Sequence, residues 1–116
     1  MPLPDRLLLH LGPGDRRLVA LDEIYYLEAA GEDSRVRLRS RTLLTDTRPL
    51  GELERLLAPH GFFRAHRDTL VNLRRVREIR RRADSEDWEL KIEPPVNRVL
   101  PISRRRLQDL WQVVGG

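Results

Sequence analysis

The sequence predicts a single, mostly β domain with short helices near its middle and at its end. Most segments place apolar residues at every second position, which is the period of a strand with one buried face. Two segments instead place them at intervals of three and four, which is the period of an amphipathic helix. The 116 residues suit one domain that spans residues 1–116, with a core of about 6–114.

Strand patterns run through most of the chain. Leu7, Leu9 and Leu11 repeat at every second position, and the Gly-Pro-Gly-Asp turn at 12–15 returns the chain into a second strand. Residues 24–29 suit a pleated sheet, and Gly-Glu-Asp-Ser at 31–34 breaks that strand. The predicted strands are residues 6–11, 17–21, 24–29, 35–39, 42–45, 76–80, 88–93 and 96–100.

The middle of the chain changes to a helical period. A helix is predicted over residues 49–58, and its apolar stripe is formed by Leu50, Leu53 and Leu57. Proline suits the first turn of a helix and glycine suits its end, so Pro49 and Gly61 bound the segment. The adjacent Phe62 and Phe63 are predicted to lie in the core.

The final segment, residues 103–114, is predicted to be a second helix. Its apolar stripe is formed by Leu107, Leu110, Trp111 and Val114. We expect Ser103 to cap this helix, because its hydroxyl can accept a hydrogen bond from a backbone N–H of the first turn. Strand alternation and helical spacing together predict that four side chains are buried: Trp88, Leu90, Ile92 and Trp111.

Arginine dominates the charged residues. The formal net charge is +4, and the 22 basic residues are 21 arginines and Lys91. Between His60 and Arg82, eight arginines stand against only Asp68 and Glu78. The planar guanidinium suits phosphate and guanine, which points to a nucleic-acid partner. The alternative is that these runs are simply solvated faces in a sequence with a general excess of arginine.

The second helix begins with an electrostatic conflict. Three arginines at 104–106 follow Ser103, and a cation at the positive end of a helix costs about 0.3–1 kcal/mol when nothing neutralises it. A bound anion would remove the conflict, because free N–H groups and arginine side chains together form a phosphate site. Alternatively, the arginines reach back to acidic neighbours.

No enzyme is predicted. His66-Arg67-Asp68 followed by Asn72 is close to the catalytic loop of protein kinases, but one residue is missing between Asp68 and Asn72, and the chain has no glycine-rich phosphate loop. The three histidines lack paired metal-ligand spacing and cysteine is absent, so neither a metal nor a cofactor is expected.

Several motifs resemble the LytTR family of DNA-binding domains. The central motif reads Phe-Phe-Arg-Ala-His-Arg, then Leu-Val-Asn-Leu, at residues 62–67 and 70–73. Further segments similar to the family pattern are residues 22–29, 50–54 and 101–105. The likeness extends from about Arg6 to Val114, in the right order and spacing.

This resemblance implies an elongated all-β domain of antiparallel sheets with short helices, including one at the carboxy terminus. It implies an output domain of bacterial transcription regulators that binds imperfect direct repeats in promoter double-stranded DNA. Three regions make the contacts, at 31–35, 66–68 and 103–105, and Arg104 is expected to reach a base edge. The resulting DNA-binding candidates are Asp33, Ser34, Arg35, Arg64, His66, Arg67, Ser103, Arg104 and Arg105.

Two departures from the family pattern affect these expectations. The family often has serine where this chain has Asp68, and a carboxylate repels phosphate unless it accepts from an arginine or a cytosine amino group. The first loop, 31–34, is small and acidic, so no target sequence can be carried over. Asn72 is expected to brace a turn rather than contact DNA.

The resemblance also suggests partners. Such domains usually follow a phosphorylated receiver domain, for which this chain has no room, so it is either excised from a longer response regulator or stands alone. We expect a monomer in free solution and two copies on one DNA, because copies in the same orientation need no two-fold interface. Residues 1–12 lack signal-peptide features and no apolar run approaches a membrane span, so a cytoplasmic location is predicted.

Two other function classes stay open. A basic protein-interaction module without specific DNA binding would use the same arginines to meet an acidic partner. RNA binding would need exposed aromatic pairs that stack bases, and all candidates are predicted to be core: Tyr25, Tyr26, Phe62 and Phe63.

Overall fold

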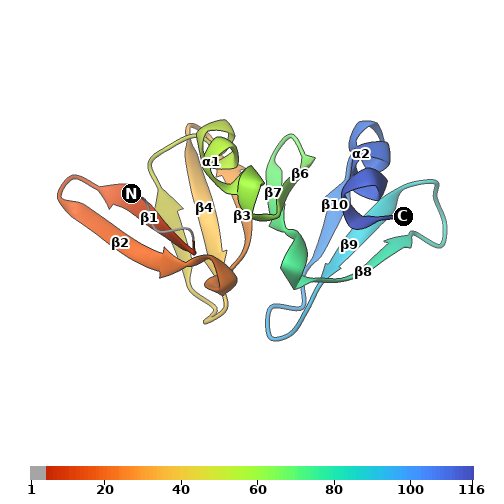
Figure 1. Cartoon of the computed structure of the whole chain (residues 1–116), viewed down its shortest axis with the longest axis horizontal. Helices are drawn as coiled ribbons and strands as arrows, with labels where there is room; N and C mark the ends of the chain where they lie inside the picture. The colour runs from red at the N-terminus through yellow and green to blue at the C-terminus, as the bar shows by residue number, and fades with distance from the viewer. Residues whose placement is uncertain (1–4) are drawn as a thin grey trace.

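The computed structural model describes residues 5–116, and strands predominate in it (Figure 1). The prediction that residues 1–12 lack signal-peptide features falls partly on residues 1–4, which lie outside the described residues. The strands are β1 (Arg6–Gly12), β2 (Asp15–Ala20), β3 (Ile24–Ala30), β4 (Asp33–Leu38), β5 (Leu43–Asp46), β6 (Phe62–His66), β7 (Thr69–Asn72), β8 (Val76–Arg81), β9 (Trp88–Ile92) and β10 (Val99–Ile102). The helices are α1 (Leu50–Leu57) and α2 (Arg104–Val114), with 3-10 turns η1 (Leu21–Glu23), η2 (Ala58–His60) and η3 (Leu73–Arg75).

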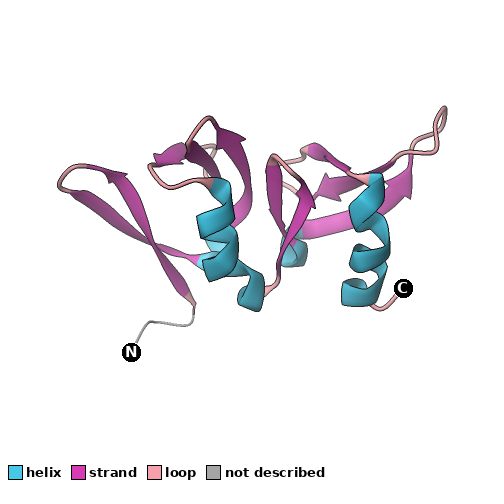
Figure 2. Ribbon diagram, turned by 90° about the horizontal axis from the view of Figure 1, so that it is seen from above, coloured by secondary structure: helices cyan, strands magenta, loops and turns pink. Residues whose placement is uncertain are grey.

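The strands form three antiparallel sheets arranged along an elongated body of 47 × 27 × 26 Å. A β1-β2 hairpin occupies one end, a five-stranded sheet of order β5-β4-β3-β7-β6 the middle, and a three-stranded sheet of order β10-β9-β8 the other end (Figure 1). In the view of Figure 2, the two longer helices stand apart along the long axis, with strands between them. The predicted mostly β, elongated fold is confirmed.

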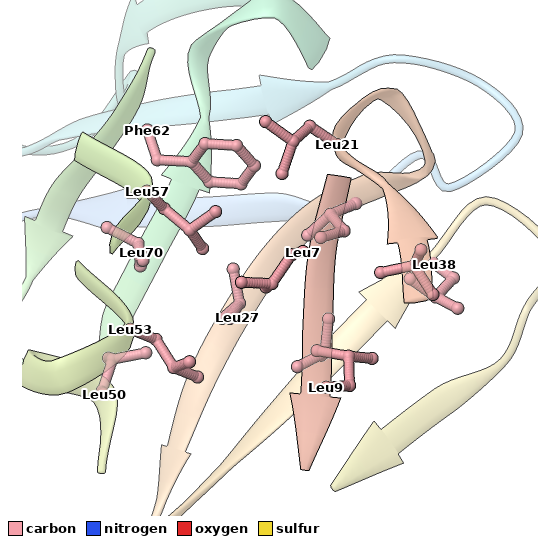
Figure 3. Close-up of a cluster of buried hydrophobic side chains, with 13 residues drawn as sticks. Leu7, Leu9, Leu21, Leu27, Leu38, Leu50, Leu53, Leu57, Phe62 and Leu70 are labelled. Carbon is pink, nitrogen blue, oxygen red and sulfur yellow. The ribbon is translucent and has the colours of Figure 1, made fainter. Parts of the chain in front are cut away.

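The five-stranded sheet separates two cores, and its strands β3, β6 and β7 contribute side chains to both of them. The first core packs the β1-β2 hairpin and α1 against one face of the sheet (Figure 3). The second packs the three-stranded sheet and α2 against the opposite side. Neighbouring side chains on one strand point to opposite faces, so Phe62 and Leu70 enter the first core while Phe63 and Val71 enter the second.

Burial on both faces also explains which strands the sequence failed to predict. Strands β6 and β7 are almost continuously buried, so they lack the alternation that marks a half-exposed strand. The last strand, β10, begins at Val99 rather than at Val96, because the 93–98 connection includes Asn97 with φ of 53°. The other predicted strands and both helices are found within one or two residues of their expected bounds.

The prediction that both tryptophans are buried is wrong. Leu90 and Ile92 are fully buried, but Trp88 and Trp111 are only partly so. The two indole rings meet edge to face, with centroids 5.1 Å apart and an interplanar angle of 84°. Of the apolar stripe of α2, only Leu110 is fully buried.

Asn72 has the structural role that was predicted. Its side chain is 2% exposed, and its Nδ2 donates to the carbonyl of Ile24 at 2.9 Å. Its Oδ1 accepts from the backbone N–H of Arg74 at 3.1 Å. Asn72 thereby ties the start of η3 to the beginning of β3.

Asp46, at the end of β5, is a fully buried carboxylate that bonds both β1 and the connection between β5 and α1. It accepts from the backbone N–H of His10 on β1 at 2.9 Å, and from the Arg48 side chain at 2.9 Å. Burial alone would raise the pKa of Asp46, but the hydrogen bonds from Arg48 and His10 outweigh it and hold that pKa below 3.8. The hairpin is therefore fixed to the connection between β5 and α1.

Candidate nucleic-acid interface

The three predicted DNA-contacting regions lie along one long edge of the molecule. Strands β3, β6 and β10 all run toward this edge, which is uppermost in Figure 1 and faces the viewer in Figure 2. The β3-β4 turn, the β6-β7 turn and the start of α2 therefore follow one another along the long axis. The fold brings together segments that are about 35 residues apart in the sequence.

The first region is the tight turn between β3 and β4. Gly31, with φ of 66°, adopts a left-handed conformation that glycine tolerates without a Cβ clash. Arg35 is exposed and has no side-chain hydrogen bond or ion pair among the residues that the structure describes. Asp33 is half-buried at the start of β4.

Ser34 does not fit its predicted place in the interface. Its side chain is fully buried, and its hydroxyl donates to the carbonyl of Arg48 at 2.8 Å. This bond holds β4 against the connection that leads into α1. We therefore assign Ser34 a structural role and leave it out of the interface.

The second region is the turn that joins β6 to β7. The Arg67 side chain is 88% exposed, and its Nε lies 3.9 Å from the Asp68 carboxylate, an open pair in solvent. His66 is half-buried, and its Nδ1 accepts from the backbone N–H of Asp68 at 3.3 Å. The carbonyl of Asp68 accepts from the backbone N–H of Ala29 at 2.9 Å, which places this turn beside the first one.

Arg64 differs from the other arginine candidates, because its guanidinium is already bonded within the protein. It donates to the Glu54 carboxylate at 2.8 Å and to the backbone carbonyls of His66 and Arg67 at 3.2 and 3.1 Å. Its side chain is 23% exposed. The structure therefore places Arg64 behind the β6-β7 turn rather than on its surface.

The third region is the start of α2, and its cap differs from the prediction. Ser103 occupies the N-cap position, but its hydroxyl makes no capping hydrogen bond. Its backbone instead holds the helix in place, since its N–H donates to the carbonyl of Ala65 at 2.8 Å and its carbonyl accepts from the N–H of Arg106 at 3.0 Å. The backbone of β6 thus positions the start of α2.

The three arginines of α2 have different surroundings. Arg104 donates to Asp87 at 2.8 Å, and Arg106 donates to Asp109 at 2.7 Å. Two of the three therefore reach acidic neighbours, as the alternative interpretation predicted. Arg105 is exposed and has no such partner within the described part of the chain. The hydrogen bond from Arg104 holds the pKa of the Asp87 carboxyl below its usual range.

Two grooves meet between the second and third regions. One has a volume of about 440 Å³ and is lined by Arg64, His66, Arg67, Ser103, Arg105, Arg106 and Asp109. The other has a volume of about 560 Å³, and four of its charged or titratable lining residues are His66, Arg82, Asp87 and Arg104. Arg82 was not among the predicted contacts, because nothing in the local sequence separates it from the adjoining arginines. Guanidinium groups from separate elements converge here, which is an arrangement that suits phosphate.

Two further searches concern metal-ligand clusters and membrane-spanning helices within residues 5–116. No group of three or more histidine, aspartate or glutamate side chains there could hold a metal ion. No helix in the described range is long and apolar enough to cross a membrane.

Comparisons with known proteins identify the fold and the family of this chain. A search of curated proteins finds no match. Among solved structures, the chain is similar to the LytTr DNA-binding domain of a Bacillus cereus protein described as a methyl-accepting/DNA response regulator. The TM-score is 0.76 at 22% sequence identity, and the match covers 97% of this chain and 98% of the other. The family model of the LytTr DNA-binding domain matches residues 15–115, so this chain belongs to the LytTR DNA-binding domain family.

Proposed function

We propose that this chain binds double-stranded DNA sequence-specifically, as the output domain of a bacterial transcriptional regulator. One observation carries the proposal: each region along the edge presents one exposed arginine without a tight partner in the described structure, namely Arg35, Arg67 and Arg105. Solubility alone would not require one such arginine in each of the three regions along the same edge. The response regulator named for the similar Bacillus cereus structure supports the same role.

The dimensions of the edge suit contact with successive grooves. The 47 Å axis corresponds to about 14 base pairs at about 3.4 Å per base pair. A duplex laid along this edge would meet the three turns one after another. Binding then uses two turns and the N-terminal end of α2, instead of a recognition helix lying in the major groove.

Arg104 is the proposed base-reading residue. Its side chain is 73% exposed and already bonds a carboxylate, the Asp87 side chain, through Nε. Guanine offers the O6 and N7 acceptors that suit a guanidinium in the major groove. Binding therefore requires Arg104 to leave Asp87 or to share its N–H groups between Asp87 and the base.

The same dimensions constrain how two copies can share one DNA. Two domains of about 14 base pairs cannot lie on one face with their centres a single turn apart, about 10 base pairs. We therefore propose that the protein reads two similar sites in the same orientation, centred about 21 base pairs apart. Each copy is a monomer before it binds.

Selection from random duplexes at low salt tests this proposal. Enrichment of paired similar half-sites in one orientation is expected, and sedimentation should detect two copies on duplexes with a 21-base-pair spacing but one copy at 10. The matched control replaces Arg35, Arg67 and Arg105 with methionine, which keeps side-chain length without charge. No enriched sequence with the wild-type protein would refute specific DNA binding and favour a basic protein-interaction module.

A further inference from the structure

We propose that Arg64 is a positioning residue, which Glu54 of α1 holds in place so that it fixes the shape of the β6-β7 turn. The inference rests on the proposed function, because the turn presents Arg67 to DNA. It assigns Arg64 a role that its motif position does not suggest. The motif places it among the DNA contacts, whereas its hydrogen bonds point into the protein.

The guanidinium of Arg64 bridges a helix and a turn. One terminal nitrogen donates to Glu54 at 2.8 Å, and both side chains are less than 35% exposed. Nε donates to the carbonyls of His66 and Arg67, and the second terminal nitrogen also donates to the carbonyl of Arg67. Each of the three guanidinium nitrogens is therefore engaged within the protein.

The backbone of the turn depends on these bonds. Of its three successive carbonyls, those of His66 and Arg67 accept from Arg64, and that of Asp68 accepts from the N–H of Ala29. The sheet register is interrupted between Arg64 and His66, and only the His66–Thr69 pair lies beyond the interruption. Arg64 adds support at this weakened end of β6, so the turn is ordered before DNA arrives. A turn that is already ordered loses less conformational freedom on binding.

Glu54 makes the two possible roles of Arg64 distinguishable. If Arg64 gripped a phosphate, Glu54 would compete with DNA for its guanidinium, so removing Glu54 would strengthen binding. If Arg64 positions the turn, removing Glu54 frees Arg64 to move and loosens the turn, so binding weakens. The second outcome runs against the simple electrostatic expectation that losing a negative charge helps a DNA-binding protein.

The test compares Glu54→Ala with Glu52→Ala by fluorescence anisotropy on the selected duplex. Both glutamates lie on α1 and lose the same charge, but the Glu52 side chain is exposed and makes no hydrogen bond among the described residues. We expect Glu54→Ala to weaken binding about three- to tenfold, while Glu52→Ala binds as tightly as the wild type or slightly tighter. Binding by Glu54→Ala that equals or exceeds that of Glu52→Ala would overturn the inference.

Hydrogen exchange without DNA gives a second, independent readout. In Glu54→Ala, the backbone N–H groups of residues 66–69 should exchange several-fold faster, while those of β3 and β9 keep their wild-type rates. Unchanged exchange in the turn would also overturn the inference. If the wild type bound no duplex, the proposed function would fail, but this exchange measurement would still decide whether Glu54 and Arg64 order the turn.

Discussion

The salt dependence of DNA binding can be worked out from the exposed arginines. Three side chains, Arg35, Arg67 and Arg105, stand on the edge without a tight protein partner in the described structure. Each phosphate contact releases counterions and contributes about 0.9 to the slope of log affinity against log salt. Three contacts give a slope of about −2.7, and a fourth from Arg104, once released from Asp87, gives about −3.6.

These slopes correspond to large changes in affinity. Between 50 and 200 mM salt, a slope of −2.7 weakens binding about 40-fold, and a slope of −3.6 weakens it about 150-fold. Replacing any one of the three arginines with methionine should remove about 0.9 from the slope, which is about 3.5-fold over this range. Fluorescence-anisotropy titrations of one labelled duplex at four or five salt concentrations would measure these values.

A matched control separates the edge from general positive charge. Arg55 is exposed in the last turn of α1 and belongs to none of the three regions along the edge. Arg55→Met removes the same charge as Arg67→Met, but it should leave the slope unchanged. A wild-type slope shallower than about −1, or equal slopes for the two variants, would refute the assignment of the edge as the phosphate-contacting surface.

Three further predictions concern stability and the carboxylates of the structure. Leu110→Ala should lower the free energy of unfolding by about 2–5 kcal/mol, as measured by urea unfolding. Trp111→Ala should lower it by only about 1–3 kcal/mol, because Trp111 is partly exposed. A larger loss for Trp111→Ala than for Leu110→Ala would contradict the observed packing. Asp46→Asn should cost about 3–5 kcal/mol at pH 7. Because the folded pKa of Asp46 lies below its ordinary value, its contribution is fully present above that ordinary value and is lost as pH falls through the folded pKa, so wild type and variant should converge in acid. Asp87→Asn should raise affinity for random-sequence duplexes at an unchanged melting temperature, and weaker binding would show that Asp87 helps Arg104 instead of competing for it.

The sequence predicted those strands that have one exposed face. Strand β4 is an example, because Val36 and Leu38 point into the core while Arg35 faces outward. Strands β6 and β7 escaped prediction because both their faces are covered, one by each core. That double coverage depends on how the three sheets assemble, and no local pattern reports it.

The candidate interface could be outlined from the sequence as three segments but not residue by residue. Short motifs located the turns, because a turn is a local structure. The state of each side chain depends on distant partners: the Ser34 hydroxyl is bonded to the carbonyl of Arg48, and Arg104 pairs with Asp87, 17 positions away. Arg64 and Arg67 look equivalent in the motif, yet only the fold shows that the first faces inward and the second faces solvent.

Each of the three regions along the edge has a carboxylate close to one of its arginines, and this pairing has a consequence for the proposed specificity. Asp33 lies two residues from Arg35, Asp68 lies 3.9 Å from Arg67, and Asp87 bonds Arg104 at 2.8 Å. A carboxylate at the contact surface repels every phosphate backbone equally, so it weakens binding to any sequence. Specificity depends on the difference between the affinities for specific and non-specific DNA. A penalty that is equal for all sequences reduces occupancy of the many non-specific sites, because no base contacts offset the penalty there. Under the proposed function, the acidic residues beside these arginines would make binding depend on base contacts and on two copies together, despite the net charge of +4.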